Sequence, residues 1–186
     1  MKKIVTVIAL MVVTSINAQT KVAGYAMPNT VLANGTTLIM NGGGMREKLI
    51  FDLYVGVLYM ETKSSDANLV MNADKSMAIK LRITSGMIDK ENMEEAIREG
   101  FDKSTNGKVT PLKTDIDNLI KKGFADEIVK GDVFDLIYVP GKGTILAKNN
   151  KMLVNIKGLD FKKALFGIWL CDKPADADLK ENMLGK

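Results

Sequence analysis

Residues 41–62, NGGGMREKLIFDLYVGVLYMET, decide the fold of this chain. Three glycines and a lone arginine stand between the β-like segment TTLIM, at 36–40, and a long run rich in aromatic and β-branched residues. This order predicts a β-hairpin whose turn lies at the glycines. In the second strand, each odd position from 49 to 59 is apolar or aromatic, whereas the even positions mix polar and apolar residues. One face should therefore pack on the core, and the other should meet solvent or a wet cavity.

Outside the hairpin, helical and strand patterns occur in blocks. Helices are predicted over 64–73, 88–104, 114–128, 160–170 and 175–184, and further strands over 76–83 and, three in number, within 132–156. Strands and helices do not alternate one by one, as they would in a parallel βαβ fold. The fold class is therefore α+β, with a mainly antiparallel sheet backed by a layer of helices.

Several side chains are assigned to these helices by spacing. Met93, Ile97 and Phe101 recur at helical intervals and should face the core. Trp169 and Phe166 are expected in the core or in the wall of a pocket.

Hydroxyl and carboxylate side chains mark where the helices begin. Ser64 or Ser65 is expected to cap the first helix and Thr114 the third, because their oxygens accept a hydrogen bond from the first turn. Acidic pairs at 115/117 and 176/178 could be read as metal ligands, but at helix starts they are better explained by capping and the helix dipole. We expect no metal site and no cofactor.

The first residues, MKKIVTVIALMVVTSINAQT, predict a cleaved secretory signal. Two lysines precede an apolar run over 4–13, and the small residue Ala18 follows. The run is too short to span a bilayer, and no later segment reaches about 18 uninterrupted apolar residues. We therefore expect a signal peptide over 1–18, a single domain over 19–186, no transmembrane segment in the mature protein, and a periplasmic or secreted location.

Composition excludes several classes of function. The formal charge is +4, of which Lys2 and Lys3 supply +2, and the remaining lysines are interspersed with acidic residues, which argues against nucleic-acid binding. The single cysteine, Cys171, cannot form an intramolecular disulfide and is read as structural. The chain has no histidine, which removes the commonest general base and every catalytic triad that depends on imidazole.

Three segments together resemble the chalcone isomerase-like superfamily, specifically its exported bacterial branch. They cover most of the predicted mature chain and are NGGGMREKLIFDLYVGVLYME, AIKLRITSGMIDKENMEEAIREGF and FKKALFGIWLCDKPADADLKENMLGK. The resemblance implies the superfamily's open-faced sandwich of sheet and helices. It leaves function open, because the superfamily includes plant enzymes that cyclise chalcones, non-catalytic plant members that bind fatty acids, and bacterial members of mostly open role.

Matching residues to this superfamily favours binding over catalysis. Arg46 falls on the pocket arginine, which in the fatty-acid binders pairs with a carboxylate. Tyr54 falls where the binding branch has a tyrosine and the catalytic branch a threonine. Asp89, Ala96 and Ile168 fall where the enzymes have an active-site tyrosine, asparagine and threonine, so three polar groups of the cyclisation site are absent. Cys171 replaces the usual glycine of the closing motif, which affects local backbone geometry only.

The residues themselves leave two interpretations of Arg46 and Tyr54 open. A guanidinium beside an apolar cavity offers a fork of donors matched to a carboxylate, yet most arginines are simply solvated. Tyr54 can donate its hydroxyl to the same carboxylate or be an aromatic on a half-exposed strand. On one unbroken strand they would lie roughly 26 Å apart, so either the chain bends between them or they serve different ends of a cleft.

The leading hypothesis is an exported, non-catalytic protein that binds a fatty acid or similar amphipathic carboxylate in an apolar cleft. Its predicted ligand-binding residues are Arg46 and Tyr54, and no catalytic residue is predicted. The alternatives are an isomerase or lyase acting on a substrate unlike chalcone, and an envelope module that binds a partner protein without a small ligand. The pattern does not fix the oligomeric state.

Overall fold

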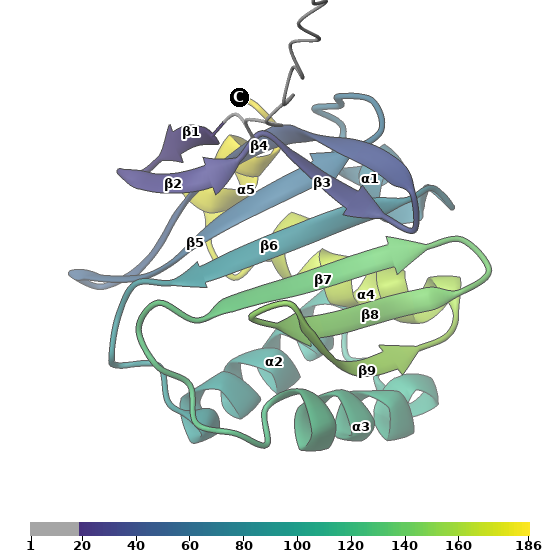
Figure 1. The fold of residues 1–186 in the computed structure, drawn as a ribbon. Coiled ribbons are helices and arrows are strands. Elements are labelled where there is room, and N and C mark those ends of the chain that lie inside the picture. Colours follow the sequence, from purple (N-terminus) through teal and green to yellow (C-terminus); the bar gives the residue numbers. More distant parts are fainter. Residues whose placement is uncertain (1–18) are drawn as a thin grey trace, which may run out of the picture.

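The computed structural model describes residues 19–186, and the predicted signal peptide over 1–18 lies outside them. Its centre is a seven-stranded antiparallel sheet in which each strand pairs with the next along the chain (Figure 1). In order these strands are β3 (Thr30–Ala33), β4 (Thr36–Lys48), β5 (Phe51–Met60), β6 (Met77–Ile83), β7 (Val133–Val139), β8 (Gly143–Lys148) and β9 (Lys151–Ile156). A separate hairpin is formed by β1 (Gln19–Val22) and β2 (Tyr25–Pro28).

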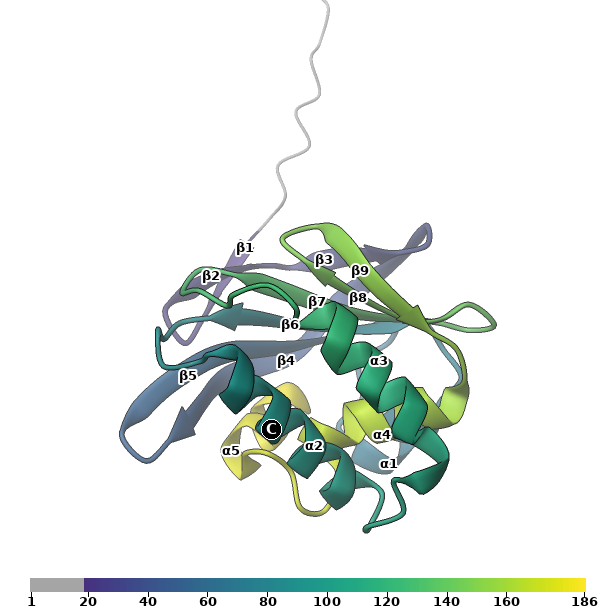
Figure 2. The same ribbon diagram turned by 90° about the horizontal axis from the view of Figure 1, so that it is seen from below.

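Five helices in this part of the chain gather on one face of the sheet (Figure 2). They are α1 (Ala67–Asn72), α2 (Lys90–Ser104), α3 (Lys113–Gly123), α4 (Leu159–Leu170) and α5 (Ala177–Met183), with a 3-10 turn over Thr110–Leu112. α5 packs on β4, α3 packs on β8 and β9, and α4 contacts both α1 and α2. The predicted α+β class, a mainly antiparallel sheet backed by helices, is confirmed. None of these helices is long and apolar enough to cross a bilayer.

The predicted hairpin at 41–62 is present, but the prediction of its turn was wrong. β4 continues through the three glycines, and the chain reverses at Leu49 and Ile50. The glycines serve close packing instead. A Cβ on Gly42 would overlap the carbonyl oxygen of Asn182, and one on Gly44 would lie 2.9 Å from the Asn182 side-chain nitrogen. α5 therefore lies against nearly bare backbone of β4.

β5 is covered on both faces, which the alternating pattern did not predict. The even-numbered Tyr54 and Leu58 belong to the main core between the sheet and the helices. The odd-numbered Val55 and Val57 pack in a smaller cluster on the opposite face, together with residues of the β1–β2 hairpin. The face predicted to be half polar is thus the one that meets the helices.

Asn41 fixes the irregular part of β4 to its surroundings. The pairing with β5 shifts by one residue between Met40 and Gly42, which leaves Asn41 as a bulge. Its side-chain amide donates to the carbonyl oxygens of Ser64 (2.9 Å) and Met183 (2.8 Å), and its oxygen accepts from the Ser64 N–H. This buried side chain has its polar atoms satisfied, so the bulge is a stable part of the fold.

The helix starts agree only in part with the predicted caps. Asp66, not Ser64 or Ser65, caps α1, where it accepts from the Leu69 N–H at 3.0 Å. α3 follows directly on the 3-10 turn and has no side-chain cap, so Thr114 does not cap it. Asp176 caps α5 as expected from its position at a helix start.

The packing of the helical side chains follows the predicted spacing. Met93, Ile97 and Phe101 are buried on α2, as the spacing predicted.

Candidate functional site

Arg46 and Tyr54 are direct cross-strand neighbours. In the pairing of β4 with β5, Arg46 faces Tyr54, and its guanidinium carbon lies 5.5 Å from the centre of the tyrosine ring. The estimated separation of roughly 26 Å holds only for one unbroken strand. Because the chain reverses at Leu49 and Ile50, β4 and β5 lie side by side, and the side chains of Arg46 and Tyr54 are neighbours on the same face of the sheet.

Two neighbouring hollows share this pair in their linings. An inner cavity of about 40 Å³ lies between the sheet and the helices, and an outer pocket of about 290 Å³ opens beside the β4–β5 turn. Arg46, Tyr54, Met93 and Ala96 line both. The rest of the inner wall is apolar apart from the Trp169 indole, and consists of Leu81, Ile97, Leu119, Phe124, Phe134, Leu136, Leu146, Leu165, Ile168, Trp169 and Ala175.

Arg46 brings unused hydrogen-bond donors to the boundary of the two hollows. The residue is half-buried, and its Nε atom is buried without a partner among residues 19–186. No carboxylate in that part of the chain forms an ion pair with it. Because a guanidinium is always charged and only donates, this arrangement can bind an anion with acceptor oxygens.

Tyr54 supplies a second donor at the same boundary. Its side chain is buried, and its oxygen accepts a hydrogen bond of 2.8 Å from the indole N–H of Trp169 on α4. Burial raises the pKa of Tyr54, although the nearby Arg46 charge and the Trp169 N–H partly oppose the rise. The phenol therefore stays protonated at neutral pH, and no described residue accepts its O–H.

The positions matched to the superfamily's catalytic residues have structural roles here. Asp89 caps α2, where its carboxylate accepts from the backbone N–H of Asn92 at 2.7 Å. Ala96 lies in the wall shared by the two hollows, and Ile168 lies in the inner wall. None of the three places an acid or base against the inner cavity.

The mouth of the outer pocket combines charged and apolar side chains. Lys48, Glu95 and Glu99 contribute to its lining, and Glu99 forms an ion pair of 2.6 Å with Lys103, which lowers the Glu99 pKa. Beside them, Leu49 is 89% exposed at the turn. The mouth is therefore open to solvent and is bordered in part by apolar side chains.

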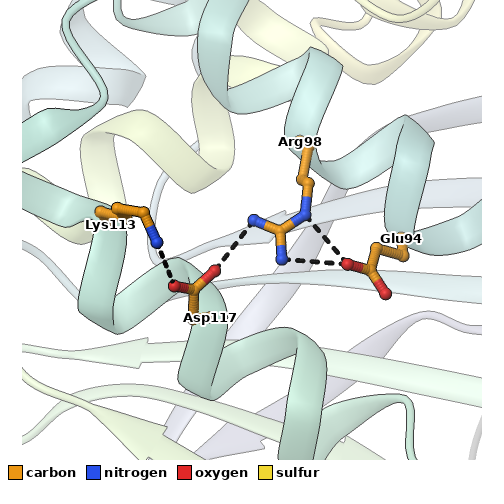
Figure 3. Close-up of polar contacts among 4 residues, drawn as sticks. All are labelled: Glu94, Arg98, Lys113 and Asp117. Atoms are coloured by element: carbon orange, nitrogen blue, oxygen red, sulfur yellow. Dashed lines mark hydrogen bonds and ion pairs between the residues drawn. The ribbon is translucent and has the colours of Figure 1, made fainter.

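An ion-pair network links α2 and α3, two helices that supply cavity-lining side chains (Figure 3). Arg98 of α2 pairs with Glu94 on its own helix and with Asp117 of α3, each at 2.9 Å, and Lys113 reaches the same Asp117 at 2.8 Å. Solvent screens these exposed charges, so each pair contributes little to stability. Asp117 is thereby engaged with two cations, and no cluster of acidic and cysteine side chains in residues 19–186 could hold a metal ion.

A third hollow, of about 550 Å³, lies at the far end of β5, beside α1. It is larger, but its charged residues, Glu61, Lys63 and Lys75, are all exposed. Water screens such groups and weakens any contact with a ligand. We therefore place the candidate site at Arg46 and Tyr54.

Sequence reasoning assigned Trp169 only to the core or a pocket wall and missed its hydrogen bond to Tyr54. The available signal was chemical. A buried tryptophan needs an acceptor for its N–H, and a tyrosine in the same core is a suitable one. Met93 was predicted only as a core residue, because nothing in a helical stripe tells which members border a cavity. Ala96 was named only as the position of an absent catalytic asparagine, and it lines both hollows.

Comparisons with known proteins agree with this architecture. The sequence model of the chalcone isomerase-like family matches residues 19–185. Among solved structures, a fatty-acid-binding protein of Arabidopsis thaliana superposes with a TM-score of 0.67 at 16% sequence identity, and the match covers 87% of this chain and 92% of that one. At such low identity the likeness concerns the fold alone. A comparison with curated proteins found no match.

Proposed function

Because this chain belongs to the chalcone isomerase-like family, we propose that it binds an amphipathic carboxylate, such as a fatty acid, and does not transform it. The head group lies between Arg46 and Tyr54, and the tail extends between the sheet and the helices. The fatty-acid-binding protein that shares the fold supports this choice of ligand class.

One observation carries the proposal: a half-buried arginine with an unpartnered Nε stands at the entrance of an apolar cavity. Leaving a buried donor unsatisfied costs about 1 to 3 kcal/mol. A ligand carboxylate that accepts from Arg46 would remove that cost and add a charge-assisted hydrogen bond. Its hydrocarbon part would at the same time leave water for the apolar wall.

The tail needs more room than the inner cavity offers. A cavity of about 150 Å³ is the size that admits benzene, and the inner cavity measures about 40 Å³. Met93 lies at the boundary of the two hollows. Because methionine is unbranched and has three rotatable bonds, movement of its side chain opens the passage inward.

The same wall supports binding over chemistry. General acids and bases act within hydrogen-bond reach of the proton they transfer. In the inner wall the ionisable side chains are Arg46, whose guanidinium only donates hydrogen bonds, and Tyr54, whose pKa is raised by burial. A substrate held there meets donors for orientation and no base to abstract a proton.

The test is a titration of a straight-chain fatty acid and of the alcohol of equal length against the wild type, Arg46→Ala and Arg46→Lys. Arg46→Ala should weaken binding of the acid about ten- to a hundredfold, because a charge-assisted hydrogen bond contributes roughly 1.5 to 3 kcal/mol. Arg46→Lys should recover part of the loss, because an ammonium keeps the charge without the planar fork.

The alcohol is the matched control, since it lacks the charge that Arg46 recognises. Its affinity should be nearly indifferent to Arg46→Ala, and thermal melts of all three proteins check that they are folded. Equal binding of the acid by all three would show that Arg46 is not the head-group contact, and the proposed function would then fail.

A further inference from the structure

Hydrogen-bond donors predominate among the polar groups of the inner cavity. Its lining contains three polar side chains, Arg46, Tyr54 and Trp169, and no carboxylate, amide or aliphatic hydroxyl. Arginine and the tryptophan indole can only donate. Tyr54 alone is ambiguous, because a phenol can both donate and accept.

The indole of Trp169 removes this ambiguity. Its N–H donates to the Tyr54 oxygen over 2.8 Å, and both residues are at most 5% exposed, so water does not compete for the bond. Together with the positive charge of Arg46, which faces the same ring, this bond leaves the Tyr54 oxygen little capacity to accept another hydrogen bond. What Tyr54 retains is its own O–H, which donates to no other residue within 19–186.

We propose that Trp169 is a positioning residue that makes Tyr54 a donor toward the ligand and so selects an ionised carboxylate over a hydroxyl head group. The inference rests on the proposed function and deepens it. Trp169 acts through Tyr54 and need not touch the head group itself.

The selectivity follows from counting donors and acceptors. An ionised carboxylate has acceptor atoms only, so it can accept hydrogen bonds from both Arg46 and Tyr54 and brings no donor that would remain unpaired. An alcohol brings an O–H of its own, and in this cavity that proton finds no acceptor while the Tyr54 oxygen is occupied. A buried donor without a partner is unfavourable, so the alcohol binds more weakly than its size alone would predict.

The experiment compares the acid-to-alcohol preference of the wild type with that of Trp169→Phe, for ligands of equal chain length. Loss of the indole N–H frees the Tyr54 oxygen to accept from the alcohol. We expect the acid to bind about threefold more weakly and the alcohol about threefold more tightly, which lowers the preference roughly tenfold. A merely structural role of the indole would weaken both ligands by the same factor.

Phe124→Leu is the matched control, because it also shrinks an aromatic side chain of the inner wall but removes no polar atom. It should change the affinities of acid and alcohol alike and leave their ratio unchanged. If Trp169→Phe behaves in the same way, the inference is overturned while the proposed function stands. If the wild type binds no acid, the proposed function fails, and this inference fails with it.

A second measurement does not depend on the stability of the Trp169 variant. Trp169 is the only tryptophan of the chain, so its indole N–H gives a single resonance in a proton–nitrogen NMR spectrum. Tyr54→Phe should move that proton upfield and speed its exchange with solvent, because its acceptor is lost. An unchanged resonance would show that the bond is absent in solution, and the inference would be abandoned.

Discussion

At the scale of single residues, Asp132 shows how one buried carboxylate joins separate segments. Its side chain is 6% exposed and lies just before β7. It accepts from the Val129 N–H at 2.9 Å and from the Asn149 amide at 2.8 Å, and it pairs with Lys148 at 2.8 Å. Burial alone would raise the pKa of Asp132, but these three partners outweigh it and hold the pKa below its ordinary value.

This environment predicts a stability difference that depends on pH. A carboxyl group with a lowered folded-state pKa stabilises the protein above its unfolded pKa of about 3.9, and this contribution disappears as the pH falls through the folded value. Asp132→Asn should therefore lower the free energy of unfolding by about 1.5 to 3 kcal/mol at pH 7. Urea denaturation of both proteins between pH 7 and pH 2.5 should show the difference shrinking below about pH 4. A difference that stays constant over this range would contradict the assignment.

At the scale of elements, the contact between α5 and β4 depends on glycines. Gly42 and Gly44 leave no room for a side chain beneath Asn182. On the neighbouring strand, a Cβ on Gly56 would lie 2.7 Å from the Met183 methyl group. Three positions on two strands therefore allow one helix to approach the sheet closely, next to the strand segment that carries Arg46.

Gly42→Ala tests this packing. Its methyl group would meet a backbone carbonyl, which cannot rotate away as a side chain can, so we expect a loss of about 1 to 3 kcal/mol in the free energy of unfolding. Gly86→Ala is the control, because a Cβ there meets nothing within 4 Å. Urea denaturation measures the loss, and hydrogen exchange should show it concentrated in α5. Equal stability of the two variants would rule out close packing as the reason for Gly42.

At the scale of the whole molecule, we propose that the protein is exported after removal of a signal peptide. Cleavage after Ala18 would release a chain that starts at Gln19, the first residue of β1. Intact-mass measurement of the exported protein should give a chain beginning at Gln19. Ala18→Arg should retain the longer chain, because cleavage requires a small residue at this position. A wild-type protein that keeps residues 1–18 would contradict the signal-peptide prediction.

Much of the architecture was predictable because it depends on local patterns. Alternation and β-branched composition identified the strands, helical spacing identified the buried side of α2, and the grouping of strands and helices gave the α+β class. The three closely spaced glycines predicted a turn, and this prediction was wrong because β4 continues through them. Glycine permits both a turn and a close approach of two backbones, and a linear pattern does not distinguish the two uses.

The site was predictable only as a list of residues. Arg46 and Tyr54 were predicted from the sequence, but no local pattern indicated their contact or the hydrogen bond from Trp169. The same holds outside the site for the fully buried Lys162, whose ammonium donates to the carbonyl oxygens of Val70, Met71 and Ala73. These contacts join segments far apart in the chain.

From residue 36 onward, the sequence by itself thus determined which segments become strands and helices, because backbone preference and hydrophobic period act over a few residues. The three strands over 19–33 were not predicted. Only the tertiary structure decided which side chains meet. That outcome depends on the turn at Leu49 and Ile50 and on two register shifts between β4 and β5. A shift of one residue turns a side chain to the opposite face of a sheet, so Arg46 faces the cavity for a reason that lies in the pairing of whole strands.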